Sequence, residues 1–159
     1  MRAYADSSFI LRLLIAEADS AAAIAAYRRV GLPPLFFLPL HALEVRNAIL
    51  QRAFHQRRSL PNCRRQDIAR ERDAALDRLA RFLARRAFLD VALDMELVMV
   101  QATELATKHT ERIGARAIDL LHVTSAMALQ SEVFFTTDDR QAQLGKAEGL
   151  KVVAIATAD

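Results

Sequence analysis

The chain has 159 residues, 53% of them apolar, which fits one globular domain with a sizeable core rather than a disordered protein. Its single cysteine, Cys63, excludes an internal disulfide and a zinc site built from several cysteines. The net charge is only +3, the N-terminus has no signal-peptide pattern, and no apolar stretch approaches the roughly 20 residues that cross a bilayer, so we expect a cytoplasmic protein without a membrane segment.

The first half of the chain alternates between short apolar runs and segments with helical periodicity. Turn and capping residues mark the changes, for example Gly31 before two prolines, and Pro39. The predicted elements are, in order, a strand over residues 2–5, a helix over 7–16 opened by Ser7 or Ser8, a helix over 20–30 capped by Ser20, a strand over 35–38, the helix that carries Glu44, and, after a turn at 59–62, a long helix over 64–87.

The second half continues this alternation and determines the predicted fold class. Its predicted elements are a strand over 88–92, a helix from Asp94 to about 108, a polar connection over 110–116, a helix to about 130 that carries Asp119, a strand over 133–136, a helix over 139–147 and a last strand over 151–155. Strands joined by helices favour a parallel sheet. We therefore predict a single α/β domain over 1–159, with three layers: a central parallel sheet of four to five strands and helices on both faces.

Positive charge is concentrated in one segment of this domain. Between Arg52 and Arg86 there are eleven arginines against four acids, a local charge of +7 that leaves −4 for the rest of the chain. A basic segment beside an acidic body suits a polyanionic substrate such as a nucleic acid. The alternative is a solvated helix face whose arginines contact nothing. The segment over about 52–90 is therefore predicted to be helical and rich in arginine, with its role left open.

Four acids occupy positions where a parallel sheet brings side chains together. Asp6 follows the first predicted strand and Asp138 follows the strand over 133–136, while Glu44 and Asp119 lie in the first turns of helices. In open α/β sheets, ligands bind in the crevice outside the carboxyl ends of the strands, so these side chains are expected to converge there. The alternative for each acid alone is favourable interaction with a helix dipole.

Four neighbouring carboxylates repel one another unless protons or cations neutralise them. One or two Mg²⁺ or Mn²⁺ ions would relieve this repulsion and lower the pKa of a bound water that attacks phosphorus. This chemistry needs no nucleophile from the protein.

Five fragments of the chain resemble the PIN-domain ribonucleases, and in particular the VapC-type toxins of bacterial toxin–antitoxin pairs. They are residues 4–8 (YADSS), 43–49 (LEVRNAI), 118–126 (IDLLHVTSA), 135–140 (FTTDDR) and 148–153 (EGLKVV). Their order and spacing cover nearly the whole chain. The resemblance implies a PIN-like fold and divalent-metal binding by Asp6, Glu44, Asp119 and Asp138.

The resemblance leaves two points open and suggests supporting residues. The segment over 52–90 is longer and richer in arginine than the two-helix clip of the family. Asp138 is preferred to Asp139 as the fourth acid because Thr136-x-Asp138 matches the family pattern; Asp139 is expected to begin or cap the next helix. Ser7 and Ser8 are candidates either as helix caps or as donors to a metal-bound water, and Thr136 would orient a carboxylate. Arg46 and Asn47 would contact RNA phosphate or solvent. His122 is expected to be a core histidine rather than a general base.

The function implied by the resemblance is a Mg²⁺- or Mn²⁺-dependent endoribonuclease that leaves 3′-hydroxyl and 5′-phosphate ends. It would be the toxin of a type II pair, neutralised by a cognate antitoxin, and a homodimer for which the apolar early helices offer a surface. The alternative is a non-catalytic PIN-like domain that binds RNA or a protein. Mn²⁺-dependent cutting of RNA that is lost on chelation distinguishes the two.

Overall fold

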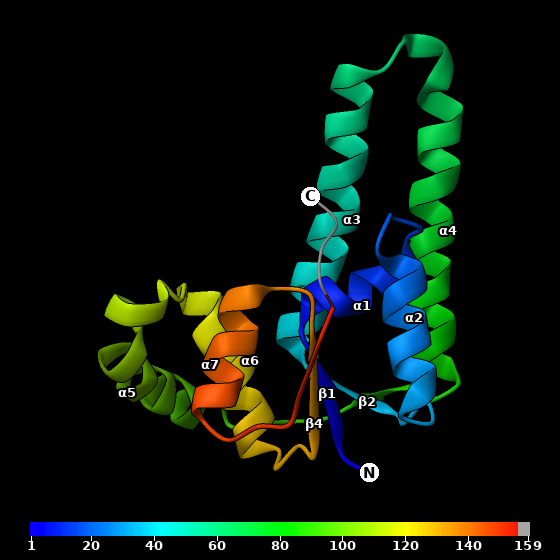
Figure 1. Cartoon of the computed structure of the whole chain (residues 1–159). Helices are drawn as coiled ribbons and strands as arrows, with labels where there is room; N and C mark the ends of the chain where they lie inside the picture. Colours follow the sequence, from blue (N-terminus) through cyan, green and yellow to red (C-terminus); the bar gives the residue numbers. More distant parts are fainter. Residues whose placement is uncertain (156–159) are drawn as a thin grey trace.

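The computed structural model describes residues 1–155, and its centre is a parallel sheet with the strand order β3-β2-β1-β4-β5 (Figure 1). In this order β1 is central, with Ala3 opposite Leu35 on one side and Val133 on the other. The strands are short: β1 (Ala3–Ala5), β2 (Leu35–Phe37), β3 (Phe88–Asp90), β4 (Val133–Thr136) and β5 (Val152–Ala154). The predicted α/β fold with a parallel sheet of four to five strands is confirmed.

Helices cover both faces of this sheet. The helices of the described residues are α1 (Ser7–Leu14), α2 (Ser20–Arg29), α3 (Pro39–Ser59), α4 (Arg65–Ala84), α5 (Met95–Ile113), α6 (Ala117–Ala128) and α7 (Asp139–Ala147), with a short 3-10 turn at Asn62–Arg64. Successive strand side chains point to opposite faces. Accordingly Phe135 packs in a core with α1 to α4, whereas Tyr4 and Phe134 pack in a second core with α5 to α7.

Two predicted boundaries were wrong. The polar connection expected over 110–116 is helical as far as Ile113, because α5 continues until Gly114 adopts a left-handed conformation (φ 69°) that glycine tolerates well. The cap of α2 is Asp19 and not Ser20, which is the first residue of the helix.

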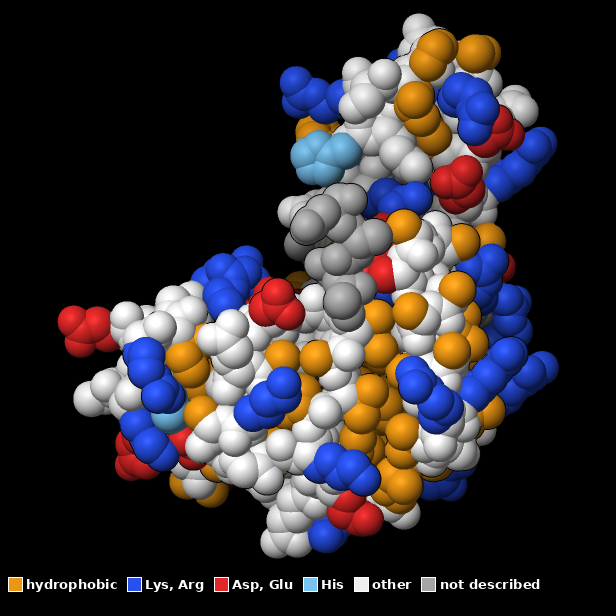
Figure 2. Space-filling view, in the orientation of Figure 1, with side chains coloured by type: hydrophobic (Ala, Val, Ile, Leu, Met, Phe, Trp, Pro, Cys, Tyr) orange, Lys and Arg blue, Asp and Glu red, His pale blue; other side chains and the backbone are white. Residues whose placement is uncertain are grey.

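Two long helices, α3 and α4, extend beyond the rest of the molecule and form a hairpin (Figure 1). We call its outer part, residues 54–72, the arm. Ile68 is the one fully buried residue of the arm, and its six arginines against two acids give it a charge of +4. Arg side chains lie along the arm, and Lys and Arg side chains lie over the body beneath it (Figure 2).

No helix within residues 1–155 is long and apolar enough to cross a membrane.

Candidate active site at the carboxyl edge of the sheet

The site lies where the chain leaves the central strands in opposite directions. From β1 the chain continues to β2 on one side, whereas β4 lies on the other side, so the crevice between β1 and β4 is a topological switch point. Asp6 follows β1, and its backbone N–H donates to the Phe135 carbonyl of β4 at 3.0 Å. Asp138 follows β4. The fold therefore places these two predicted acids at one edge.

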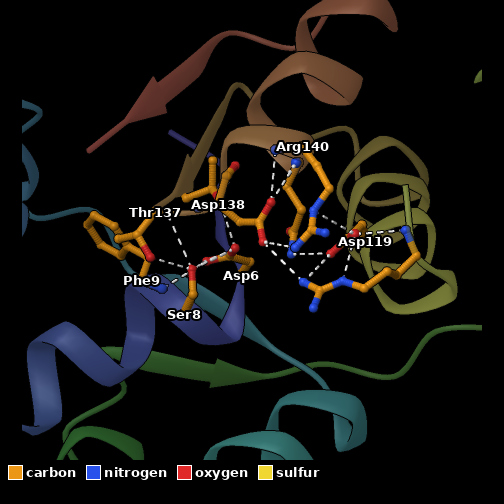
Figure 3. Close-up of polar contacts among 10 residues, drawn as sticks. Asp6, Ser8, Phe9, Asp119, Thr137, Asp138 and Arg140 are labelled. Carbon is orange, nitrogen blue, oxygen red and sulfur yellow. Dashed lines mark hydrogen bonds and ion pairs between the residues drawn. The ribbon is translucent and has the colours of Figure 1, made fainter. Parts of the chain in front are cut away.

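Asp6 is a fully buried carboxylate that is held by neutral donors. Its Oδ1 caps α1 by accepting from the Phe9 backbone N–H at 2.8 Å, and its Oδ2 accepts from the Thr136 hydroxyl at 2.7 Å. The Ser8 hydroxyl donates toward the same carboxylate, at 2.7 and 2.8 Å from its two oxygens, and accepts from the Thr137 hydroxyl at 2.7 Å (Figure 3). No Lys or Arg of the described chain forms an ion pair with Asp6. Burial raises the pKa of Asp6, and the hydrogen bonds lower it only in part.

Ser7 and Ser8 do not cap α1. The cap is Asp6, and both serines lie within the first turn of the helix. Their hydroxyls therefore bond acidic side chains, Ser8 to Asp6 and Ser7 to Glu44 at 2.8 Å. The prediction that a serine caps α1 was wrong, because Asp6 precedes both serines and its carboxylate accepts the hydrogen bond from the Phe9 N–H.

Glu44 projects from α3 and is bound through one of its oxygens. Its Oε2 accepts from the Ser7 hydroxyl at 2.8 Å and lies 2.6 Å from Nε2 of His122 on α6. Burial alone would raise the pKa of Glu44, but the hydrogen bonds from His122 and Ser7 and the charge of Arg116 outweigh it, so the pKa is held below its usual value. Glu44 is thus an ionised carboxylate with 27% of its side chain exposed.

Asp119 and Asp138 occupy the starts of two helices. Asp119 is fully buried, and it accepts from the Arg116 backbone N–H at 2.8 Å and from the Gln141 amide at 3.2 Å. Asp138 caps α7 through the Arg140 and Gln141 N–H groups, at 2.8 and 3.3 Å. Burial would raise the pKa of Asp138, but the bonds from Arg140 and Gln141 lower it overall.

Two arginines that the sequence analysis missed lie between these acids. Arg116 Nη2 is 3.1 Å from Asp138 Oδ2, and Arg116 Nε is 3.3 Å from Asp119 Oδ2. Arg140 Nη2 is 3.3 Å from Asp138 Oδ2, and Figure 3 shows its guanidinium between the two carboxylates. The spacing of three residues between Arg116 and Asp119 at a helix start was the available signal.

The remaining predicted residues lie at or near this edge. Asp139 is the exposed first residue of α7, as expected for a helix start. Thr136 ends β4 and bonds Asp6. Arg46 and Asn47 lie on an exposed part of α3, in the turn that follows Glu44.

The chemistry of the donors fits a divalent cation, with one condition. Four carboxylates against two guanidinium groups leave a charge of −2 at an edge lined by oxygen atoms, which Mg²⁺ and Mn²⁺ prefer as ligands. Within residues 1–155, however, no three His, Cys, Asp or Glu side chains are arranged to hold a metal ion. Arg116 and Arg140 instead form ion pairs with Asp119 and Asp138. A cation would therefore have to displace these half-exposed arginines.

A comparison with protein-family models identifies the family of the chain. The family model described as PIN domain matches residues 3–147, which is most of the chain and includes all four acids. No curated protein matches the chain.

Proposed function

The chain belongs to the PIN-domain family, whose members are in general nucleases, and we propose that it is a metal-dependent endoribonuclease that hydrolyses phosphodiester bonds of RNA. We further propose that the whole chain, 1–159, is one nuclease domain, of which 156–159 lie outside the described residues.

Asp6 is the observation that best supports this proposal. A carboxylate with no exposed surface and no ion-pair partner among residues 1–155 carries a desolvation cost, and a neutral asparagine could cap α1 without that cost. Three neutral donors hold it in one orientation at the switch point of the sheet. Such a preorganised and destabilised charge is typical of a functional site.

Each residue has a distinct role in the proposed mechanism. Asp6, Glu44, Asp119 and Asp138 would hold Mg²⁺ or Mn²⁺, one ion or two, and Thr136 and Ser8 fix the orientation of Asp6. A bound ion would supply positive charge that acidifies a water molecule and stabilises the charge developing on the phosphate.

The test is cleavage of single-stranded RNA in the presence of Mn²⁺ or Mg²⁺, with and without a chelator. We expect cutting that the chelator abolishes and that Asp119→Asn reduces by about 1,000-fold, because a charge at the reacting centre is lost. Asp139→Asn is the matched control. It removes the same charge from the next residue, but Asp139 is the exposed first residue of α7 and is not one of the four proposed metal ligands. A protein that binds RNA but never cuts it would support the non-catalytic alternative.

We propose that RNA approaches along α3 and the arm. Arg46 and Asn47 are exposed in the turn after Glu44, and the arm continues from the same helix with a charge of +4. Exposed Phe54 lies beneath the Arg58 guanidinium, 5.5 Å from the ring centroid. An aromatic ring beside a cation suits stacking and phosphate contact with single-stranded RNA.

The proposed antitoxin partner fits a groove at the base of the arm. This groove, of about 470 Å³, has an apolar floor that includes Leu14, Ile49 and Ala75, while Arg52 and Arg78 contribute positive charge. A peptide with alternating apolar and acidic side chains would match it. A small protein from the same operon that copurifies with the chain and stops cleavage would support the toxin role. If the chain is purified from its native cells and no such protein accompanies it, the toxin role is contradicted.

We also propose a homodimer, but through a different surface from the one expected. The early helix α1 cannot offer its apolar side, because Phe9 and Leu14 are in the core. The α3 side chains Leu43 and Leu50 are instead 69% and 50% exposed and lie on one side of the helix. An oligomeric state measured by sedimentation, with Leu50→Ser as the test variant, checks this surface.

A further inference from the structure

Two buried side chains from different elements lead to Glu44. Tyr4 of β1 is fully buried, and its hydroxyl lies 2.9 Å from Nδ1 of His122, which is 1% exposed. The other ring nitrogen of His122 lies 2.6 Å from Glu44 Oε2. The rings of Tyr4 and His122 pack edge-on, with centroids 5.9 Å apart. The three residues belong to β1, α6 and α3, so only the folded chain brings them together.

The donors and acceptors in this chain of hydrogen bonds can be assigned. The carboxylate oxygen of Glu44 accepts at 2.6 Å, so Nε2 is the ring nitrogen of His122 that carries the proton and donates. Nδ1 is then the accepting ring nitrogen, and the Tyr4 hydroxyl donates to it at 2.9 Å. The neighbouring His41 adds no charge, because burial lowers its pKa to about 3.

This arrangement leaves one oxygen of Glu44 available. Oε2 accepts from both His122 and Ser7, which uses its two lone pairs. Oε1 accepts no hydrogen bond from the described part of the chain. The same bonds exclude His122 as a general base, since both of its ring nitrogens are already engaged.

We propose that Tyr4 and His122 are positioning residues that hold Glu44 in the one orientation that presents Oε1 to a divalent cation. The inference rests on the proposed function of the carboxylate edge, and it adds which residues fix the orientation of Glu44. Partners of this kind, which hold a ligand without touching the ion, change metal affinity by about 10- to 100-fold when they are removed.

Two substitutions at His122 separate positioning from simple packing. The amide nitrogen of His122→Gln falls near Nε2 of the ring and can still donate to Glu44, whereas that of His122→Asn falls near Nδ1 and cannot. We expect His122→Asn to weaken Mn²⁺ binding about 30-fold and to lower kcat by a similar factor with little change in KM. His122→Gln should stay within about threefold of wild type.

Tyr4→Phe provides a second variant that keeps the aromatic packing. Removal of its hydroxyl should weaken Mn²⁺ binding about threefold to tenfold, since His122 loses the group that fixes its ring. The measurements are calorimetric titration of Mn²⁺ without RNA, cleavage kinetics, and ¹H–¹⁵N NMR of the His122 ring, which should carry its proton on Nε2.

The outcomes distinguish this inference from the proposed function. If wild-type protein binds Mn²⁺ and His122→Asn binds it equally well, or if Gln and Asn variants lose affinity alike, the positioning role is wrong and the nuclease proposal stands. A His122 ring protonated on Nδ1 alone would also overturn it. If wild-type protein binds no Mn²⁺ and cuts no RNA, the proposed function fails, and the metal-positioning role with it.

Discussion

The carboxylate edge and the arm are both charged, yet they are built in opposite ways. At the edge, Asp6 and Asp119 have no exposed surface, and every acid is fixed by a helix cap, a hydroxyl or an arginine. In the arm, only Ile68 is buried, and ion pairs such as Arg64–Asp67 are solvent-exposed. The edge is rigid and depends on the position of single atoms, whereas the arm depends on the number of its charges.

The largest effect should come from a single atom change at the edge. Asp6→Asn keeps the size of the side chain and its acceptor for the Phe9 N–H but removes the buried charge. We expect cleavage to fall about 1,000-fold while RNA affinity changes little. Cleavage rates at saturating RNA check this, and a loss below tenfold would mean that the edge is not where the chemistry occurs.

In the arm, by contrast, single atoms should matter little and total charge should matter more. Arg57→Gln with Arg58→Gln should weaken RNA binding roughly tenfold and reduce the slope of log affinity against log salt by about 1.4, at about 0.7 for each lost phosphate contact. The rate at saturating RNA should hardly change. The control is the same double substitution at Arg85 and Arg86, which lie at the end of α4 away from the arm. Equal losses of RNA affinity from both pairs would mean that RNA binding is not localised in the arm.

Arg116 shares features of both regions, since it is 57% exposed and yet bonds two acids of the edge. If it competes with a cation for these acids, Arg116→Ala should strengthen Mn²⁺ binding by roughly threefold, a modest effect because both lost ion pairs involve a half-exposed arginine. Calorimetric titration of Mn²⁺ measures this. Weaker Mn²⁺ binding in the variant would instead make Arg116 a support of the metal site.

The smallest effect should be on stability, and its sign should differ between two acids of the same edge. Burial raises the pKa of Asp6, so the ionised form of Asp6 lowers the stability of the protein at pH 7. Asp6→Asn should therefore raise the melting temperature slightly at pH 7. It should have no such effect at a pH below 3.8, the usual pKa of aspartate, where Asp6 is protonated in both the folded and the unfolded protein. Asp138 has a lowered pKa, so its ionised form is stabilising above 3.8, and Asp138→Asn should cost about 0.5 kcal/mol at pH 7. That cost should disappear as the pH falls through the lowered pKa. Thermal melts of both variants at pH 7 and pH 3 test the two signs, and equal shifts would contradict them.

The sequence was informative where local pattern decides structure. Apolar runs located all five strands, and the aspartates that follow β1 and β4 could be placed at one edge because parallel strands end together. The end of α5 was misplaced because the polar stretch from Thr110 was interpreted as a connection, although Glu111 and Arg112 are good helix formers and the stop signal is Gly114.

Contacts between distant segments were beyond local pattern. Nothing near Tyr4 in the sequence indicates that its hydroxyl meets a histidine 118 residues away, or that His122 in turn meets Glu44. Arg140 follows two aspartates and suggests a surface pair, whereas its reach toward buried Asp119 depends on how α7 packs beside α6. Such pairings depend on tertiary packing, which periodicity does not encode.

The pairing of β1 with β4 has a consequence for synthesis of the protein. The Thr136 hydroxyl that fixes Asp6 is 130 residues away along the polypeptide. A ribosome must therefore release the chain as far as β4 before this edge can form, so a polypeptide that stops short of β4 carries Asp6 without its arrangement. Any activity of this edge would therefore begin only after β4 has left the ribosome and paired with β1.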